Sequence, residues 1–405
     1  ATKEKVAAAE SLHLEKSVSK IVTEIKPDEF PIDTIIRNIR KAEGVTSSKV
    51  EYETVTYRAR SGQTAAATAN AGTDTSKTWT LDSTDMFAVD DIITRVGSTY
   101  NIAAGGDLTV TGGKDWRGQV TAIDSGTTMT VISLNTASDY VPDVADNTVL
   151  YRLGNAKTEL DAQTSVITQT PGTDYNYTQI HMCQLEQSQV LAKHKSYSGY
   201  GQNDRRLQEV YNFRSSLEAT NIAGYRGSKT IGNDVHYTSD GLREKIGNEV
   251  LFGTGSSAVD PSSDDVIDLL EDVFAGNAGS EERYLFGGKK VISGLQKINF
   301  NKEQVATGTD IKWGVKVKVL ESNFGMLYIK HSKMMDQLGY QNDALVLDFN
   351  HIYKHDLEPM QSTKLELDKS GQRRVQDAVR ILENSCITVR YQDDVHAWWT
   401  PDPAV

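Results

Sequence analysis

The chain has 405 residues, a formal net charge of −12 and a pI near 5.2, and 38% of its residues are hydrophobic. This acidic balance excludes a protein that grips nucleic acid tightly on a basic face, but it allows a wall that encloses nucleic acid without sticking to it. The hydrophobic share is low for a compact enzyme of this length and indicates extended arms, loops or a large exposed surface. We expect two or three domains.

The two cysteines, Cys183 and Cys386, are too few to form a metal site alone and indicate a reducing compartment without a disulfide framework. No apolar run is long enough to span a bilayer, and the charged N-terminus lacks the apolar core of a signal peptide. We therefore expect a soluble product made inside a cell. Ala1 follows either removal of an initiator Met or a processing cut.

The first 60 residues predict two helices and a strand. Residues 1–26 carry spaced apolar side chains among Lys, Glu and Ala, which indicates a terminal helical arm that Pro27 ends. Residues 31–41 are apolar at 32, 35, 36 and 39, the spacing of a short amphipathic helix. The alternation over 49–60 predicts a strand.

A composition shift then marks a separate module. Residues 61–75 are small and polar, as in a linker. From Ser76 to Leu153, short β-type segments separated by glycines predict a small β-barrel or sandwich inserted in a larger fold. The chain after this module, as far as Tyr175 and Tyr177, is predicted to form the second strand of an extended two-stranded loop.

A long helix is predicted over 202–224, about 30 Å in length. Its expected cap is Asn203 or Asp204, and Gly224 is expected to end it in the left-handed conformation. The apolar stripe consists of Leu207, Val210, Tyr211, Phe213, Leu217 and Ile222. Two charged pairs four residues apart, Arg205 with Glu209 and Arg214 with Glu218, lie on the polar side. Such a face suits either solvent or contact with other chains.

The second half mixes helices and strands, which indicates an α+β fold. Pro261 opens a helix that Ser262 or Ser263 caps and Gly276 ends. A strand over 284–288 and a helix over 289–300 follow. Further strands are expected at 311–320, 326–331, 343–353, 361–368 and 385–391, with a helical segment at 377–382.

The sequence predicts no catalytic residues, no cofactor and no metal site. His351 and His355 are four apart, but their strand-like surroundings favour ordinary histidines over ligands. No GxxxxGK[ST] or GxSxG motif occurs. Trp398 and Trp399 beside Asp394 are either a ligand-binding aromatic cluster or, as we prefer, a terminal strand buried against a neighbouring strand or subunit.

As an ordered set, these parts resemble the HK97-type fold of tailed-phage major capsid proteins, in particular the family with a small β-domain inserted near the extended loop. The residues that carry the resemblance are 149–162, 175–180, 202–224, 284–298 and 343–357. The resemblance implies seven regions: an N-terminal arm (1–30), the start of the peripheral domain and extended loop (31–75), the inserted β-domain (76–153), the loop's return strand (154–198), the spine helix with peripheral domain (199–239), the axial domain (240–345) and C-terminal peripheral strands (346–405).

The resemblance implies a structural protein, not an enzyme, that self-assembles into hexamers and pentamers of an icosahedral shell enclosing double-stranded DNA. It would act in the virion after synthesis in the host cytoplasm. Its partners would be copies of itself, a portal, scaffolding protein, decoration protein and, weakly and non-specifically, packaged DNA, with no membrane.

Nine residues are the candidate inter-subunit contacts: Tyr175, Tyr177, Arg205, Arg206, Glu209, Arg214, Glu218, Trp398 and Trp399. The alternative function is a tail, baseplate or host-surface-binding protein that uses the β insertion for attachment. A hydrolase that uses His351, His355 or Asp394 is the third hypothesis.

Overall fold

The computed structural model describes residues 30–39, 43–55, 59–68, 75–96, 99–102, 108–111, 115–134, 141–142, 144–157, 159, 171–188, 202–253, 260–276, 278–298, 309–312, 315–365 and 376–402. The helix predicted over 1–26 lies outside these residues. The chain forms two compact units. We call Ala1–Thr54 with Thr173–Val405 the body, and Val55–Gly172 the β-unit.

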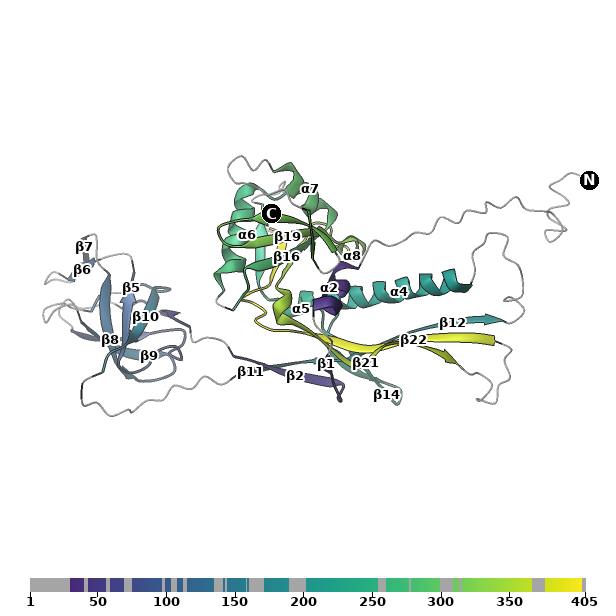
Figure 1. The fold of residues 1–405 in the computed structure, drawn as a ribbon. Coiled ribbons are helices and arrows are strands. Elements are labelled where there is room, and N and C mark those ends of the chain that lie inside the picture. The colour runs from purple at the N-terminus through teal and green to yellow at the C-terminus, as the bar shows by residue number, and fades with distance from the viewer. Residues whose placement is uncertain are drawn as a thin grey trace, which may run out of the picture. The chain divides into compact units, whose positions relative to one another are not determined.

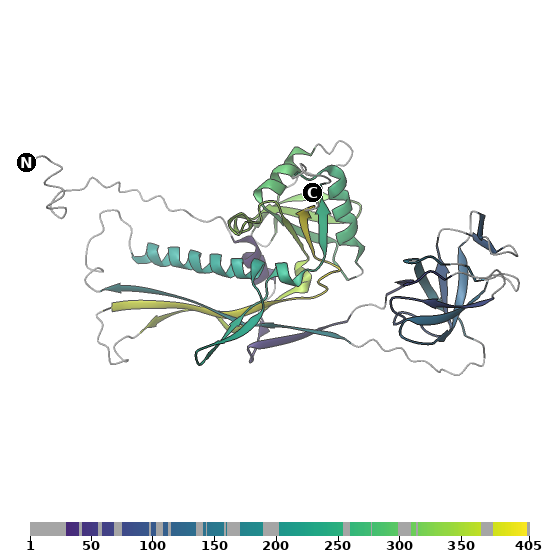
Figure 2. The ribbon, with the colours of Figure 1, turned by 180° about the vertical axis from the view of Figure 1, so that it is seen from behind.

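One layer of the body is a four-stranded sheet along which a long helix runs (Figures 1 and 2). The strand order is β1 (Glu43–Gly44), β21 (Ile352–Leu365), β22 (Gln376–Val389) and β12 (Gln179–Ser188). Strand β22 is antiparallel to both of its neighbours, and β1 is parallel to β21. Helix α4 (Gln202–Ala223) confirms the predicted long helix and packs Phe213 and Leu217 with Ile381 of β22.

The details of α4 differ from the prediction at three positions. The helix begins at Gln202, so Asn203 and Asp204 lie inside its first turn instead of capping it. Leu207 is 56% exposed, so the buried stripe starts farther along the helix. Gly224 follows the helix without a positive φ. It is needed because a Cβ there would lie 2.5 Å from the Ser239 carbonyl oxygen.

The second layer of the body is a seven-stranded sheet that is covered on both faces. Its order is β15 (Glu249–Phe252), β23 (Ala397–Pro401), β20 (Ala344–Leu347), β16 (Glu282–Gly287), β19 (Met326–His331), β18 (Val315–Glu321) and β17 (Thr309–Lys312). All four residues of β20 are buried. Leu345 and Leu347 belong to one apolar cluster, and Ala344 and Val346 belong to another. The continuous apolar run of β20 therefore serves two cores.

Short helices supply these two cores. Helices α6 (Ser263–Ala275) and α7 (Lys289–Lys297) contribute to one cluster, while α2 (Pro31–Ile39) and α8 (Lys333–Gln337) contribute to the other. Helix α5 (Leu242–Lys245) and the 3-10 turn η1 (Phe349–His351) complete the set. The predicted cap of α6 is confirmed: the Ser262 side chain accepts from the Asp265 amide, and the Asp265 carboxylate accepts from the Ser262 amide.

Tertiary pairing overrides the sequence pattern in several places. Residues 377–382, expected to be helical, lie in β22, where β12 and β21 pair with them on both sides. The strand expected at 311–320 is two strands, β17 and β18, paired with each other. The prediction assigns residues 346–405 to the strands of the peripheral domain, which include β21 and β22. Strand β23 lies in this range and β20 ends in it, yet these two strands pair with each other in the seven-stranded sheet and not with β21 or β22.

Two narrow β elements complete the body. Strands β2 (Lys49–Thr54) and β11 (Gly172–Tyr177) form a two-stranded ribbon. Strands β13 (Gly227–Ile231) and β14 (Asp234–Thr238) form an antiparallel hairpin that the sequence reading missed. Its signal was the Gly232-Asn233 pair, and Gly232 has the positive φ of 66° that such a tight turn needs.

The β-unit is a six-stranded sheet with its own core. The order is β3 (Ser61–Gln63), β10 (Val149–Asn155), β5 (Asp91–Arg95), β8 (Trp116–Ile123), β9 (Thr128–Ser133) and β4 (Ser76–Thr80), with β6 (Thr99–Ile102) and β7 (Leu108–Thr111) as a separate pair. A bridge between Thr64 and Leu81 joins the two outer strands, so the sheet closes on itself. Trp79 and Trp116 fill the interior, with ring centroids 5.3 Å apart.

The segment 61–68, expected to be part of a linker, belongs to this sheet. Its small polar residues pair through the backbone, which composition does not reveal. Gly62 is required because a Cβ there would lie 2.4 Å from the Met86 sulfur.

Candidate assembly surfaces

Asp174 is the most heavily hydrogen-bonded carboxylate at the root of the β2–β11 ribbon. It accepts from Tyr52 Oη at 2.7 Å, Arg226 Nη1 at 3.0 Å, Gln392 Nε2 at 2.9 Å and the Lys245 ammonium. Burial alone would raise the pKa of Asp174, but the hydrogen bonds from Lys245 and Tyr52 hold that pKa well below its ordinary value. One carboxylate therefore joins the ribbon to three distant segments of the body.

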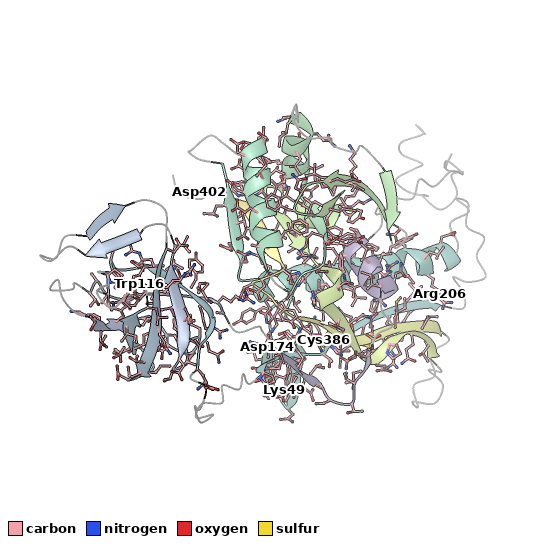
Figure 3. The ribbon with its side chains drawn as sticks, turned by 60° about the vertical axis from the view of Figure 1, so that its left-hand side comes forward. Lys49, Trp116, Asp174, Arg206, Cys386 and Asp402 are labelled. Carbon is pink, nitrogen blue, oxygen red and sulfur yellow. The ribbon has the colours of Figure 1, made fainter. Side chains whose placement is uncertain are left out.

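An aromatic row covers the same region. Tyr175 lies between two cations, with Lys49 Nζ 4.4 Å and the Arg226 guanidinium 4.3 Å from its ring centroid. Tyr177 packs against Tyr175 at 5.6 Å and against Tyr237 of the hairpin at 5.1 Å. Both residues are half-exposed, and Figure 3 shows Lys49 and Asp174 in this region. The row combines apolar area with cation–π contacts, a combination suited to protein contact.

Two buried carboxylates fix α2 to the rest of the body. Asp33 receives Arg37 Nε at 2.8 Å on one oxygen and Arg214 Nη2 at 3.0 Å on the other. Glu383 of β22 receives Arg37 Nη2 at 2.8 Å and Lys354 Nζ at 2.6 Å. Burial raises the pKa of Glu383, but Lys354 and Arg37 lower it below its usual range overall.

Glu218, also in this region, has a different environment. Its side chain is fully buried. One carboxyl oxygen has no hydrogen-bond partner among the described residues, and the other accepts a long hydrogen bond of 3.4 Å from the Asp33 amide. Burial raises the pKa of Glu218 to about 8, and the nearby Asp33 carboxylate adds to this effect. Glu218 is therefore mostly protonated at neutral pH.

We expect Glu218→Gln to remove a loss of stability that the wild type shows as pH rises. Because the folded pKa lies above the unfolded value of 4.5, the folded state binds the proton more tightly. Wild-type stability therefore falls as pH rises from about 4.5 to 8, by up to about 1.4 kcal/mol per pH unit, and levels off above that. Urea unfolding of the unassembled subunit at several pH values measures this slope. Equal slopes for the wild type and the Gln variant would contradict the assignment.

The structure separates the predicted contact residues into two groups. Arg205 is exposed, Arg206 donates to Ser362 Oγ at 2.8 Å, and Glu209 accepts from Cys183 Sγ at 3.3 Å. Arg206 is labelled on α4 in Figure 3. By contrast, Arg214 and Glu218 face α2 inside the chain and do not form the predicted solvent-facing pair. The 3.6-residue period could not reveal this, because α2 supplies the partner 181 residues away.

Trp398 and Trp399 are also internal. They are 1% and 0% exposed and belong to the two different clusters on opposite faces of the seven-stranded sheet. Both tryptophans therefore lie on a strand that is buried against neighbouring strands of the same chain. Neither side chain has surface to offer a second subunit in this conformation.

The two histidines of the hydrolase hypothesis form hydrogen bonds with a backbone carbonyl and a threonine hydroxyl. His351 Nε2 contacts the Ala278 carbonyl at 2.8 Å, and His355 Nε2 contacts Thr388 Oγ1 at 2.9 Å. Within the described residues, no group of three or more His, Cys, Asp or Glu is placed to hold a metal ion. No helix among the described residues is long and apolar enough to cross a membrane.

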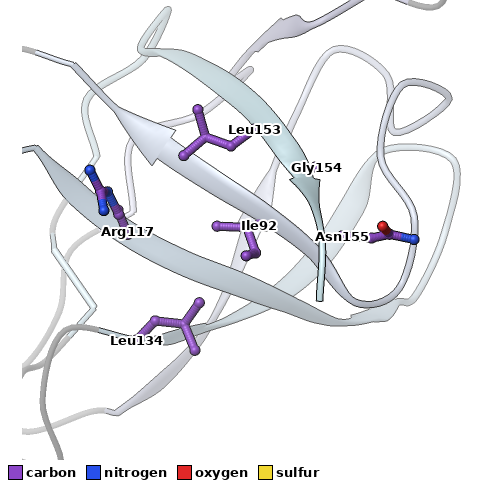
Figure 4. A pocket seen from close by; sticks show the side chains of 6 residues that line it. All are labelled: Ile92, Arg117, Leu134, Leu153, Gly154 and Asn155. Atoms are coloured by element: carbon purple, nitrogen blue, oxygen red, sulfur yellow. The ribbon is translucent and has the colours of Figure 1, made fainter. Parts of the chain in front are cut away.

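The β-unit carries a shallow hollow on its surface (Figure 4). It is lined by Ile92, Arg117, Leu134, Leu153, Gly154 and Asn155. This lining contains one charged side chain, Arg117, and no nucleophile or acid–base pair. The hollow is therefore lined by both apolar and polar groups.

The polar clusters described above fix distant segments of the body to one another. The chain belongs to the SU10 major capsid protein family, whose model matches residues 2–400. It is a major capsid protein, a structural protein that assembles with copies of itself into capsid shells, and its described elements form an α+β fold.

Solved structures with low sequence identity resemble the chain weakly. The capsid of Myoviridae phage XM1 is 11% identical, with a TM-score of 0.46, over 96% of this chain and 97% of that one. The structure titled Microbacterium phage Oxtober96 is 10% identical, with a TM-score of 0.44, over 98% and 99%. The capsid of the native GTA particle is 10% identical, with a TM-score of 0.43, over 99% of each chain. No curated protein matches the sequence.

Family membership confirms the capsid interpretation of the sequence over the tail, baseplate and hydrolase alternatives.

The sequence did not predict the roles of Asp174, Asp33 and Glu383. A single carboxylate has no periodic pattern, and its partners are distant in the sequence.

Proposed function

We propose that the chain forms hexamers and pentamers of an icosahedral shell that encloses double-stranded DNA. The observation that supports this most directly is the ribbon held at its root by Asp174, since an extended two-stranded element gains stability by lying on a neighbour. The net charge of −12 limits adhesion of the genome to the wall, so contact with packaged DNA is weak and non-specific.

The proposed contact set is Tyr175, Tyr177, Arg205, Arg206 and Glu209. These side chains lie on the ribbon root and on the outer part of α4, and each is at least partly exposed. In the same proposal, a portal, a scaffolding protein and a decoration protein complete the virion, and the chain is made in the host cytoplasm. The seven regions expected from the resemblance remain the proposed domain plan with two changes. Residues 61–68 belong to the β-unit, and strand β23 belongs to the seven-stranded sheet.

Electron microscopy of the purified protein tests this proposal. We expect hexameric and pentameric capsomers or closed shells for the wild type, and at least tenfold fewer for Arg205→Glu, because a reversed charge at a subunit contact repels its partner. The urea midpoint of the unassembled variant should match the wild type, since exposed substitutions change stability by only about 0.5 kcal/mol. A compact wild-type monomer at high concentration, without capsomers, would overturn the proposal.

A further inference from the structure

Strand β12 forms a long free edge in the body. It pairs with β22 along its ten residues, from Gln179 opposite Ser385 to Ser188 opposite Gln376. Strand β12 is last in the sheet order, so no described strand pairs with its other side. At about 3.3 Å per residue, this edge presents a row of unpaired amides and carbonyls of about 33 Å.

This edge lacks the features that normally prevent strand pairing between chains. Residues 179–188 contain no Lys and no Pro, Glu186 is their only charged residue, and the pairing with β22 has no register shift. The opposite side of the sheet is protected: β21 contains Pro359 and two register shifts, and β1 covers part of it. The contrast indicates that the β12 edge is open for pairing.

The exposed side chains of β12 add apolar area beside that edge. His181 and Cys183 face α4, where they contact Phe213 and Glu209. Ile180 and Met182 alternate with them, point away from α4, and are 64% and 61% exposed. Two large apolar side chains on an open edge favour burial against another strand.

A second copy of the chain is the partner that fits this edge. Copies with a net charge of −12 repel each other in general, but β12 brings only one charge per copy to the contact. An antiparallel strand related by a two-fold axis is self-complementary, so one edge serves both partners. The chain assembles into shells of itself, which supplies the copies.

We propose that β12 pairs edge to edge, antiparallel, with β12 of a second copy across a two-fold axis, joining two four-stranded sheets into one. The proposal rests on the shell assembly and names one of its contacts. It accounts for the unprotected edge, the low charge of the strand and the exposure of Ile180 and Met182.

A pair of matched lysine variants tests the contact. Met182→Lys adds a charge to the free edge strand, whereas Met326→Lys adds it to β19, where Met326 is 41% exposed and is paired on both sides, with Glu282 of β16 and Glu321 of β18. We expect Met182→Lys to reduce the number of shells at least tenfold and Met326→Lys to assemble as the wild type does. Thermal unfolding of both unassembled subunits checks folding. Equal assembly of the two folded variants would overturn the proposal.

Cross-linking provides a readout that does not depend on assembly yield. In a Cys183→Ser, Cys386→Ser background, Met182→Cys in assembled shells should give covalent dimers with a flexible bis-maleimide, because a two-fold axis near the middle of β12 places the two copies of position 182 within a few residues of each other along the paired strands. Met326→Cys in the same background should give none. Shells without Met182→Cys dimers would overturn the β12 pairing. Absence of wild-type shells would instead contradict the proposed function.

Discussion

Replacing Asp348 by Ala is expected to destabilise the body by about 3 to 5 kcal/mol. Asp348 and Arg283 are each 1% exposed and form an ion pair at 2.9 Å. The same carboxylate accepts from the Ser280 amide at 2.9 Å and the Asn350 amide at 3.0 Å. Removing it leaves a buried guanidinium without its counter-charge, which is far more costly than losing an exposed pair.

Urea unfolding of the unassembled subunit measures this effect, and Asp260→Ala is the matched control. Asp260 pairs with Lys297 at 2.7 Å, but these side chains are 53% and 64% exposed. The control should therefore lose less than about 1 kcal/mol. Similar losses for the two variants would show that burial of the Arg283 pair does not govern its contribution.

Replacing Trp399 by Ala is expected to cost a comparable amount, about 3 to 5 kcal/mol. Trp399 is fully buried and lies 4.7 Å from Phe252 between ring centroids, within the cluster that also holds α6 and α7. A subunit with a total stability of order 5 to 15 kcal/mol would retain little after this loss. Thermal or urea unfolding of the unassembled chain provides the measurement.

The matched control for Trp399 is Leu251→Ala, on the adjacent strand β15. Leu251 is 50% exposed and pairs with Thr400, so its truncation should change stability by only about 0.5 kcal/mol. The experiment also separates core from interface. A Trp399→Ala subunit with wild-type stability and lost assembly would show that the side chain acts between subunits and not inside one.

Buried and half-buried carboxylates hold the long segments of the protein together. Asp174, Asp33 and Glu383 each bind groups from elements far apart in sequence, and each is saturated by cations and other donors. Glu218 is the exception, since it is buried among the same elements with a raised pKa. The pH dependence of stability should therefore report on the contact between α2 and α4.

Most helices and strands follow from local sequence patterns, and their order indicates the class of protein. The periodicity of residues 202–224 specified a helix, because an amphipathic stripe of that length has few other ways to be buried. Pro261 and the serines after it predicted where α6 begins, with Ser262 or Ser263 as the cap, and the structure shows that Ser262 is the cap. Short β segments with glycine turns were likewise visible as strands of the β-unit.

Long-range contacts, in contrast, fix which side chains face outward and which strands pair. Arg214 and Glu218 match the pattern of an exposed charged pair, yet α2 covers them and Asp33 becomes the partner of Arg214. Residues 377–382 form a strand because β12 and β21 flank them. In each case the deciding partner is distant in sequence, and local propensities of a few tenths of a kcal/mol yield to pairing and burial worth several times more.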